Sequence, residues 1–239
     1  MKRTVWVVEG FLVFLLFTLA FRECMAGVVI EQMMKDMEGR ASKVVLYYSE
    51  EKFRTDDEEK GLTTIIDFQG DRMVMVDHRS KHYIQIKFSQ WEKEVSGRLK
   101  KEIRGIKPKV RKITVKQTGE TATINGFKTE KVQVFGDEEL IEENWVTRDV
   151  EMKELAKVME KVARSFSKDF QLEMKEGQKI YEKLKPYGYP ILVKDYAMTY
   201  GLGGIDVLEV KKMETKELKE EIFLPPIGYQ QIIPNPSQK

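Results

Sequence analysis

The sequence predicts an α+β fold in which a curved antiparallel sheet, an open half-barrel, is covered on its concave face by helices. Two observations predict this class. Short runs of branched and aromatic residues recur about every 8 to 12 residues with turns between them, which is typical of antiparallel sheets. One long amphipathic segment, residues 149–170, follows most of these runs. Because an open curved sheet leaves its inner face exposed, an element with an apolar stripe is needed to cover it.

The first half of the chain contains the clearest strand pattern. In residues 82–88, Ile84, Ile86 and Phe88 fall on one side, and the residues between them fall on the other. Such alternation indicates a strand with one face on the core and one face toward water. We expect strands at residues 28–30, 43–48, 53–55, 62–68, 72–76 and 82–88.

A helix is expected to connect this first set of strands to a second set. In residues 89–104, apolar residues recur at helical spacing from Trp91 to Leu99. Asn125-Gly126 is the strongest hairpin signal in the chain, because both positions tolerate positive φ. We expect further strands at residues 111–117, 127–135, 140–147, 191–200 and 206–216.

Residues 149–170 form the most strongly amphipathic segment. Asp149 can cap a helix that starts near Val150, and basic residues occupy the side opposite the apolar stripe. The stripe consists of Leu155, Val158, Met159, Val162, Ala163, Phe166 and Phe170. We interpret this segment as the helix that covers the sheet, in preference to a membrane-inserted helix. A short helix at residues 178–185 and a closing segment at residues 223–229 complete the expected fold.

Residues Met1 to Ala26 are typical of a removable export signal. Lys2 and Arg3 provide the positive start, and the apolar run at residues 11–20 is shorter than the roughly 20 residues that span a bilayer. We expect cleavage between Ala26 and Gly27, which leaves one half-barrel domain at residues 27–234 and a flexible tail at residues 235–239. The expected location is the periplasm or another exported compartment, without a stable membrane span after cleavage.

Two alternatives to a cleaved signal fit the sequence less well. A retained membrane anchor is disfavoured because the apolar run ends early, at Phe21, and is followed by the charged Arg22. An acylated Cys24 would require small and aliphatic residues before the cysteine, and Arg22 and Glu23 do not fit that requirement.

Composition excludes several classes of function. The chain has 239 residues, with 41 Lys and Arg against 39 Asp and Glu, so its charge gives no electrostatic basis for binding nucleic acid. Cys24 is the only cysteine and would leave with the signal. We therefore expect no disulfide, no thiol nucleophile and no cysteine-bound metal in the mature chain.

Few residues suggest catalysis or metal binding. His78 and His82 are the only histidines and flank a turn together with Asp77, but no third strong ligand lies nearby in sequence. Ser165-Phe166-Ser167-Lys168 matches a serine–lysine pattern by letters alone, without its partner motifs. We expect no catalytic residue, no metal site and no cofactor.

Several segments resemble an uncharacterised family of exported bacterial proteins, named only as a domain of unknown function. The resembling segments are residues 64–67, 73–83, 118–130, 143–149 and 223–229. At the level of fold, this family is similar to the lipoprotein-carrier (LolA/LolB-like) superfamily. The resemblance implies an antiparallel half-barrel whose apolar concave face, covered by helices, can hold acyl chains. It carries over no catalytic residues.

The expected cavity lies between the curved sheet and the covering helix. Methionine is frequent in the expected core elements and adapts to irregular apolar surfaces. The candidate lining residues are Met73, Met75, Ile84, Ile86, Leu155, Met159, Val162 and Phe166. A shift of one residue in strand register would turn the strand members of this set to the other face.

The sequence suggests three functions, in a clear order of preference. The preferred one is a periplasmic, non-enzymatic protein that binds lipid acyl chains or a lipoprotein. The alternative is an envelope module for protein–protein interaction or sensing, without a lipid ligand. A hydrolase using Asp67, Asp71 or Asp77 ranks last, because their spacing singles out no acid–base pair.

Overall fold

The computed structural model describes residues 24–36, 38–102, 111–150, 175–196 and 205–233, together with the single positions 156, 160 and 164. The strands are β1 (Cys24–Asp36), β2 (Ala41–Ser49), β3 (Lys52–Asp57), β4 (Leu62–Asp67), β5 (Arg72–Asp77), β6 (His82–Lys87), β7 (Ile113–Ile124), β8 (Phe127–Gly136), β9 (Glu139–Thr147), β10 (Tyr189–Asp195), β11 (Ile205–Lys219) and β12 (Gln230–Gln231). The described helices are α2 (Phe88–Glu102), α5 (Lys175–Leu184) and the short 3-10 helix η1 (Glu220–Phe223).

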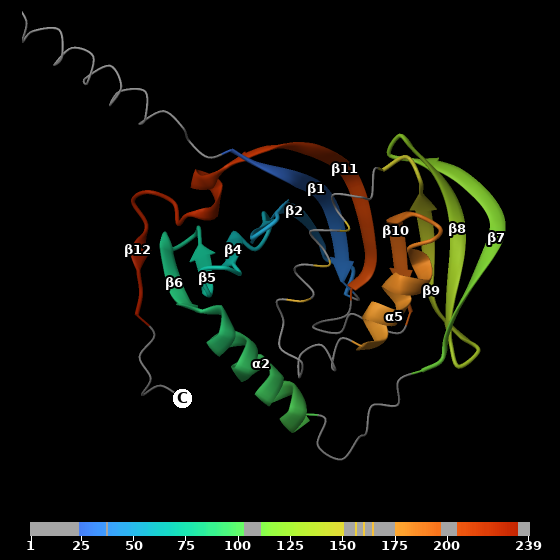
Figure 1. Ribbon diagram of the computed structural model, residues 1–239, viewed down its shortest axis with the longest axis horizontal. Coiled ribbons are helices and arrows are strands. Elements are labelled where there is room, and N and C mark those ends of the chain that lie inside the picture. Colours follow the sequence, from blue (N-terminus) through green and yellow to red (C-terminus); the bar gives the residue numbers. More distant parts are fainter. Residues whose placement is uncertain are drawn as a thin grey trace, which may run out of the picture.

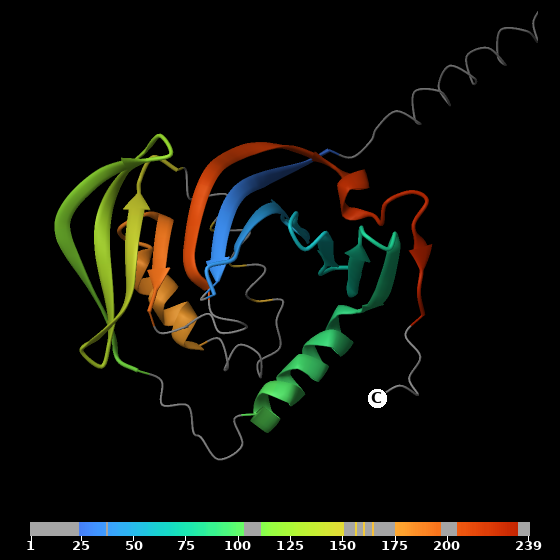
Figure 2. The same cartoon turned by 180° about the vertical axis from the view of Figure 1, so that it is seen from behind.

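All 12 strands belong to one sheet, in the order β12-β6-β5-β4-β3-β2-β1-β11-β10-β9-β8-β7. Neighbouring strands are antiparallel, except that β12 runs parallel to β6. The sheet therefore consists of two meanders, β1–β6 and β7–β11, joined by the long pairing of β1 with β11. Figure 1 shows the sheet bent into an arch whose two end strands, β12 and β7, lie far apart, and Figure 2 shows the same arch from behind.

The strands from β3 to β6 repeat with a spacing of ten residues, since they start at Lys52, Leu62, Arg72 and His82. In each of the three hairpins, the aspartate that ends the strand accepts a hydrogen bond from a backbone N–H of the following loop. These bonds are Lys60 N to Asp57 Oδ1 at 3.0 Å, Gly70 N to Asp67 Oδ1 at 2.8 Å and Arg79 N to Asp77 Oδ1 at 2.9 Å. The regular loops hold these strands in a fixed register.

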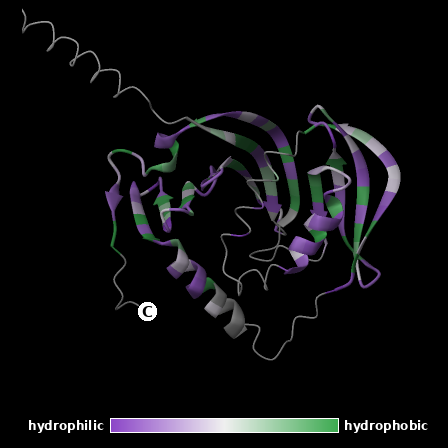
Figure 3. Ribbon diagram, viewed as in Figure 1, coloured by the Kyte–Doolittle hydropathy of each residue, from purple (hydrophilic) through white to green (hydrophobic). Residues whose placement is uncertain are grey.

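Both faces of the sheet bury apolar side chains. In β1, Val28 and Ile30 pack on the concave side, here called the inner face, and Val29 packs on the opposite, outer face. The outer face is covered by the segment 220–233, here called the C-terminal strap, through Phe223, which is completely buried. Figure 3 shows the resulting alternation of hydrophobic and hydrophilic bands along the strands.

The β7–β8 hairpin helps to cover the inner face with strand residues. Its turn, Asn125-Gly126, has positive φ at both positions, as the sequence predicts. The Asn125 side-chain amide donates hydrogen bonds to the carbonyl oxygen of Val210 at 2.8 Å and to Glu209 Oε1 at 2.9 Å. The hairpin tip therefore reaches β11, and Phe127 packs against the core on that strand.

Helices α2 and α5 lie on the inner side of the two halves of the sheet (Figure 1). Ile180 and Leu184 of α5 pack against a cluster that includes Val132 and Val134 of β8. The N-terminus of α5 is fixed by Glu176, whose carboxylate accepts hydrogen bonds from the Nε and the backbone N of Arg111. The expected helix at residues 178–185 is thus present, although it begins at Lys175.

The expected fold class is wrong. The structure is mainly β, one open sheet of 12 strands with a mixed pairing pattern, and not an α+β half-barrel covered by helices. The physical reason is that strands bury apolar residues on both faces. The C-terminal strap covers much of the outer face, and the β7–β8 tip covers part of the inner face. The helix expected at residues 149–170 and most of the expected signal segment lie outside the described residues.

Candidate binding site at the sheet edge

The inner face of β4, β5 and β6 carries a regular grid of side chains. Cross-strand pairing aligns three residues, one from each strand, in each row of this grid. From the rim inward, the rows are Leu62–Asp77–His82, Thr64–Met75–Ile84 and Ile66–Met73–Ile86. The side chains therefore change from partly polar at the rim to wholly apolar two rows further in.

Burial follows the same gradient. In the innermost row, Ile66 and Met73 are buried together with Phe88, the first residue of α2. The N-terminus of α2 is held in place by Asp71, whose carboxylate accepts hydrogen bonds from the backbone N and the Oγ of Ser89, both at 2.8 Å. The rim is open by comparison, and Leu62 is 45% exposed. The grid is thus closed at the α2 end and open at the β5–β6 turn.

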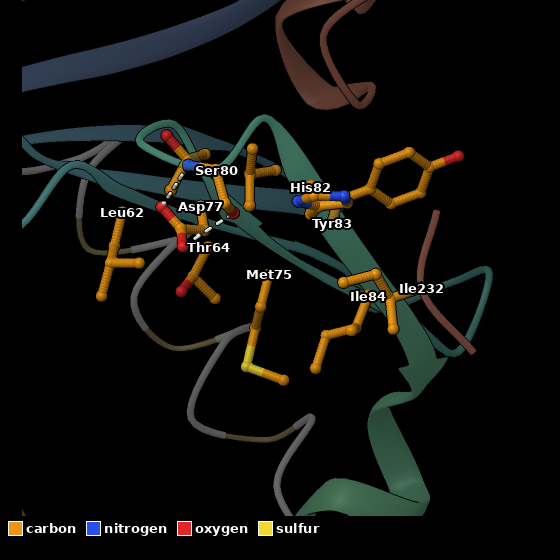
Figure 4. A pocket seen from close by; sticks show the side chains of 11 residues that line it. Leu62, Thr64, Met75, Asp77, Ser80, His82, Tyr83, Ile84 and Ile232 are labelled. Atoms are coloured by element: carbon orange, nitrogen blue, oxygen red, sulfur yellow. Dashed lines mark hydrogen bonds between the residues drawn. The ribbon is translucent and has the colours of Figure 1, made fainter. Parts of the chain in front are cut away.

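A hollow of about 290 Å³ lies over the outer two rows of the grid. It is lined by Leu62, Thr63, Thr64, Met75, Val76, Asp77, Ser80, His82, Tyr83, Ile84 and Ile232. Figure 4 shows Leu62, Thr64, Met75, Ile84 and Ile232 projecting to one side of the strands. This volume is close to the lower end of the roughly 300–1,000 Å³ that is usual for small-molecule sites.

The C-terminal strap supplies one wall of the hollow, Ile232. The backbone N–H of Ile232 donates to the carbonyl oxygen of Tyr83 at 2.8 Å, next to the two-residue pairing of β12 with β6. Further support comes from Tyr229, whose hydroxyl lies 3.0 Å from Nδ1 of His78. The Nε2 atom of His78 lies 2.8 Å from Oγ1 of the buried Thr63. This network ties the C-terminal strap to the outer face of the meander.

Asp77 and His82 form the polar rim and lie directly opposite each other on β5 and β6. Oxygens of the Asp77 carboxylate accept hydrogen bonds from the backbone N–H of Arg79 and from the hydroxyl and backbone N–H of Ser80. These donors, the Ser80 hydroxyl first among them, lower the pKa of Asp77, so its carboxylate is charged at neutral pH. The His82 ring makes no hydrogen bond with the part of the chain that the structure describes.

The structure places the expected lining residues in three groups. Met75 and Ile84 line the hollow. Met73 and Ile86 share their face, but they pack in the cluster around Phe88 and are not part of the lining. The remaining four candidates, Leu155, Met159, Val162 and Phe166, lie outside the described residues.

Sequence reasoning missed four residues of the lining that matter here: Leu62, Asp77, His82 and Ile232. The ten-residue spacing of β3 to β6 was a usable signal for the first three, because it aligns Leu62, Asp77 and His82 in one row. No local pattern indicates that Ile232 returns to this site, because its position depends on a pairing of β12 with β6 across the C-terminal strap.

The two histidines are not brought together as metal ligands. The ring of His78 contacts Thr63 and Tyr229, whereas His82 lines the hollow. Within the described residues, no group of three or more His, Cys, Asp or Glu side chains has a geometry that could hold a metal ion. The serine–lysine letter pattern at residues 165–168, from which no catalysis is expected, lies outside those residues.

The carboxylates considered for a hydrolase have turn-forming contacts. Asp67 accepts from the backbone N of Gly70, Asp71 accepts from Ser89, and Asp77 accepts from the loop that follows it. Of the three, only Asp77 lines the hollow. Their arrangement is accounted for by the hairpins and by the start of α2.

Among the described residues, no helix has both the length and the apolar character needed to cross a membrane. Cys24 to Ala26, at the end of the expected signal, pair with residues 217–219 as the first part of β1. A cut before Gly27 would therefore shorten β1 at its pairing with β11.

The open single sheet and its edge hollow define a mainly β protein with a partly polar, partly apolar surface site. A family model described as "Domain of unknown function (DUF4412)" matches residues 26–229. The chain belongs to the DUF4412 family. No protein of curated function matches it.

Three solved structures are distantly similar to this chain. An uncharacterized conserved protein from Thermus thermophilus is 8% identical, with a TM-score of 0.44 over 86% of this chain and 89% of that one. Two crystal forms of PNGF-II, in space groups C2 and P21, are 10% and 11% identical, each with a TM-score of 0.33 over 87% of this chain. The matched part is about a third of PNGF-II, 31% and 32% of its length in the two forms.

Proposed function

We propose that this chain is an exported, non-enzymatic protein that binds the acyl chain of a lipid or of a lipid-modified partner on the inner face of β4–β6. The observation that carries the proposal is the gradient of the grid, from the polar pair Asp77 and His82 to the apolar Met75 and Ile84. An amphiphile has the same gradient along its length. The proposal retains the lipid-binding character implied by the sequence resemblance, and assigns it to an open sheet edge.

Two properties of the hollow support a single acyl chain as the ligand. Its volume of about 290 Å³ can take the end of one acyl chain. Its floor includes Met75, whose unbranched thioether side chain adapts to flexible apolar partners. Export is supported by residues Met1 to Ala26, with their positive start and short apolar run.

Ile84→Glu is expected to weaken acyl binding by at least about tenfold. The substitution puts a carboxylate on the floor of the hollow, and a bound acyl tail would have to remove water from that charge. The measurement is titration with a fatty-acyl probe whose fluorophore brightens in apolar surroundings. Gln85→Glu is the matched control, since Gln85 is the next residue of β6, points to the other face and is exposed. Equal affinity of the two variants would contradict the proposal.

A second readout uses the natural ligand. Native mass spectrometry of protein purified from cell envelopes without detergent should show an added mass equal to an acyl-containing molecule. Recovery of the unliganded chain alone, together with no uptake of added acyl probe, would exclude the proposal.

One observation favours the alternative, an envelope interaction or sensor module. Within the described residues, β12 pairs with β6 only at His82 and Tyr83, so the rest of the β6 edge, up to Lys87, has no strand beside it. An open edge can receive an extended segment of another protein. Capture from periplasm of a stoichiometric protein that carries no acyl group would support this alternative.

A further inference from the structure

We infer that the acyl group reaches this site as an ester or an amide and not as a free carboxylate, with the linking carbonyl at the polar rim beside His82. This inference rests on the proposed function and names the class of ligand. Its basis is the position, at the same end of the hollow, of the Asp77 carboxylate and of the His82 ring, which has no hydrogen-bond partner among the described residues.

The orientation of the ligand follows from the grid. The α2 end is closed by the buried residues Ile66, Met73 and Phe88, and the open end lies at the β5–β6 turn. An acyl tail would therefore lie over Met75 and Ile84, with its polar end beside Asp77 and His82. Ile232, which lies near Ile84 in Figure 4, would cover the side of the tail.

The charge at the rim selects against an anionic end group. Asp77 and His82 are the only aspartate, glutamate, lysine, arginine or histidine side chains that line the hollow in the described part of the chain. Asp77 already accepts three hydrogen bonds from its own turn, so a ligand is not needed to satisfy it. A ligand carboxylate placed there would meet a like charge, whereas an ester or amide carbonyl would not.

His82 supplies the matching donor. Its ring lines the hollow and has no hydrogen-bond partner among the described residues. An imidazole N–H donates well to a carbonyl oxygen. Esters occur in glycerolipids and amides occur in acylated polypeptides, and the two share this carbonyl.

The test compares three ligands that have the same tail: dodecanoate, monododecanoyl glycerol and N-methyldodecanamide, each below its micelle concentration, by displacement of the fluorescent acyl probe. At least one neutral compound should bind wild-type protein about tenfold more tightly than dodecanoate. The ester arm reports a lipid source and the amide arm an acylated polypeptide. Dodecanoate binding as tightly as both neutral compounds would overturn the inference.

Two variants separate the two parts of the argument. Asp77→Asn retains an acceptor for the turn and should strengthen dodecanoate binding about five- to tenfold, with little change for the neutral compounds. His82→Phe should weaken the neutral compounds about fivefold, because it removes the donor to their carbonyl oxygen. Asp67→Asn is the control, because Asp67 accepts a hydrogen bond from the loop that follows β4 and does not line the hollow. An unchanged ligand ratio in Asp77→Asn would overturn the inference.

Failure of the proposed function would look different. In that case none of the three compounds would displace the probe from wild-type protein, and Ile84→Glu would behave as Gln85→Glu does. If the inference alone failed, dodecanoate would still bind to wild-type protein as tightly as the neutral compounds, and Ile84→Glu would weaken its binding.

Discussion

Gly188→Ala is expected to destabilise the protein by at least about 3 kcal/mol. Gly188 precedes β10 with a φ of +128°, and a Cβ atom on it would lie 2.1 Å from the carbonyl oxygen of Thr147. That oxygen belongs to the backbone at the end of β9, and so it cannot rotate away. The clash would force β10 away from β9, which pair at Tyr189 and Thr147.

Urea unfolding followed by circular dichroism measures this effect. Gly119→Ala is the matched control, because Gly119 also has a positive φ, of +81°, but a Cβ atom there would meet nothing within 4 Å. The loss of unfolding free energy in Gly119→Ala therefore measures backbone strain without a clash, and it should be about 1–2 kcal/mol. Equal losses of stability in the two variants would show that β9 and β10 are not packed as described.

Phe223→Ala is expected to reduce the free energy of unfolding by about 3–5 kcal/mol, the usual range for a buried phenylalanine. Phe223 is 0% exposed and packs on the outer face with Val29, Ile65 and Val74. Its removal would leave a cavity under the C-terminal strap. Because the same strap carries Ile232, the variant should also weaken acyl binding.

The control for this prediction is a variant of the neighbouring residue, Leu224. Leu224 is 40% exposed, so Leu224→Ala should change the stability by less than about 1 kcal/mol. Chemical denaturation of both variants provides the comparison. If Phe223→Ala were as stable as Leu224→Ala, the outer face would not depend on the C-terminal strap.

Local patterns in the sequence predicted many individual elements. Alternation identified β6, helical spacing identified α2, and Asn125-Gly126 identified the β7–β8 turn. These features depend on neighbouring residues alone. They required no knowledge of which segments meet in space.

The fold class was predicted wrongly because coverage of the sheet was assigned to helices alone. The run Val28-Val29-Ile30 shows the missed signal: all three residues are buried, and successive strand residues point to opposite faces. Such a run indicates a strand that is covered on both sides. Two of the covering elements within the described residues, the C-terminal strap and the β7–β8 tip, are distant in sequence from the strands they contact.

The candidate site was found only in part for a similar reason. Met75 of β5 and Ile84 of β6 lie opposite each other on the same face of the sheet, as the alternation of apolar residues predicts. The rim could have been found from the ten-residue spacing, which sets Asp77 opposite His82. The contribution of Ile232 depends on the parallel pairing of β12 with β6, and no periodic pattern in the sequence indicates that pairing.

Photo-crosslinking tests the central claim, acyl binding on the inner face of β4–β6, most directly. A neutral acyl ester with a diazirine in its tail would be bound, irradiated and located by peptide mapping. The account predicts cross-links in peptides that contain Met75, Ile84 or Ile232, and their loss in Ile84→Glu but not in Gln85→Glu. Cross-links confined to β7–β10, or equal labelling of both variants, would contradict it.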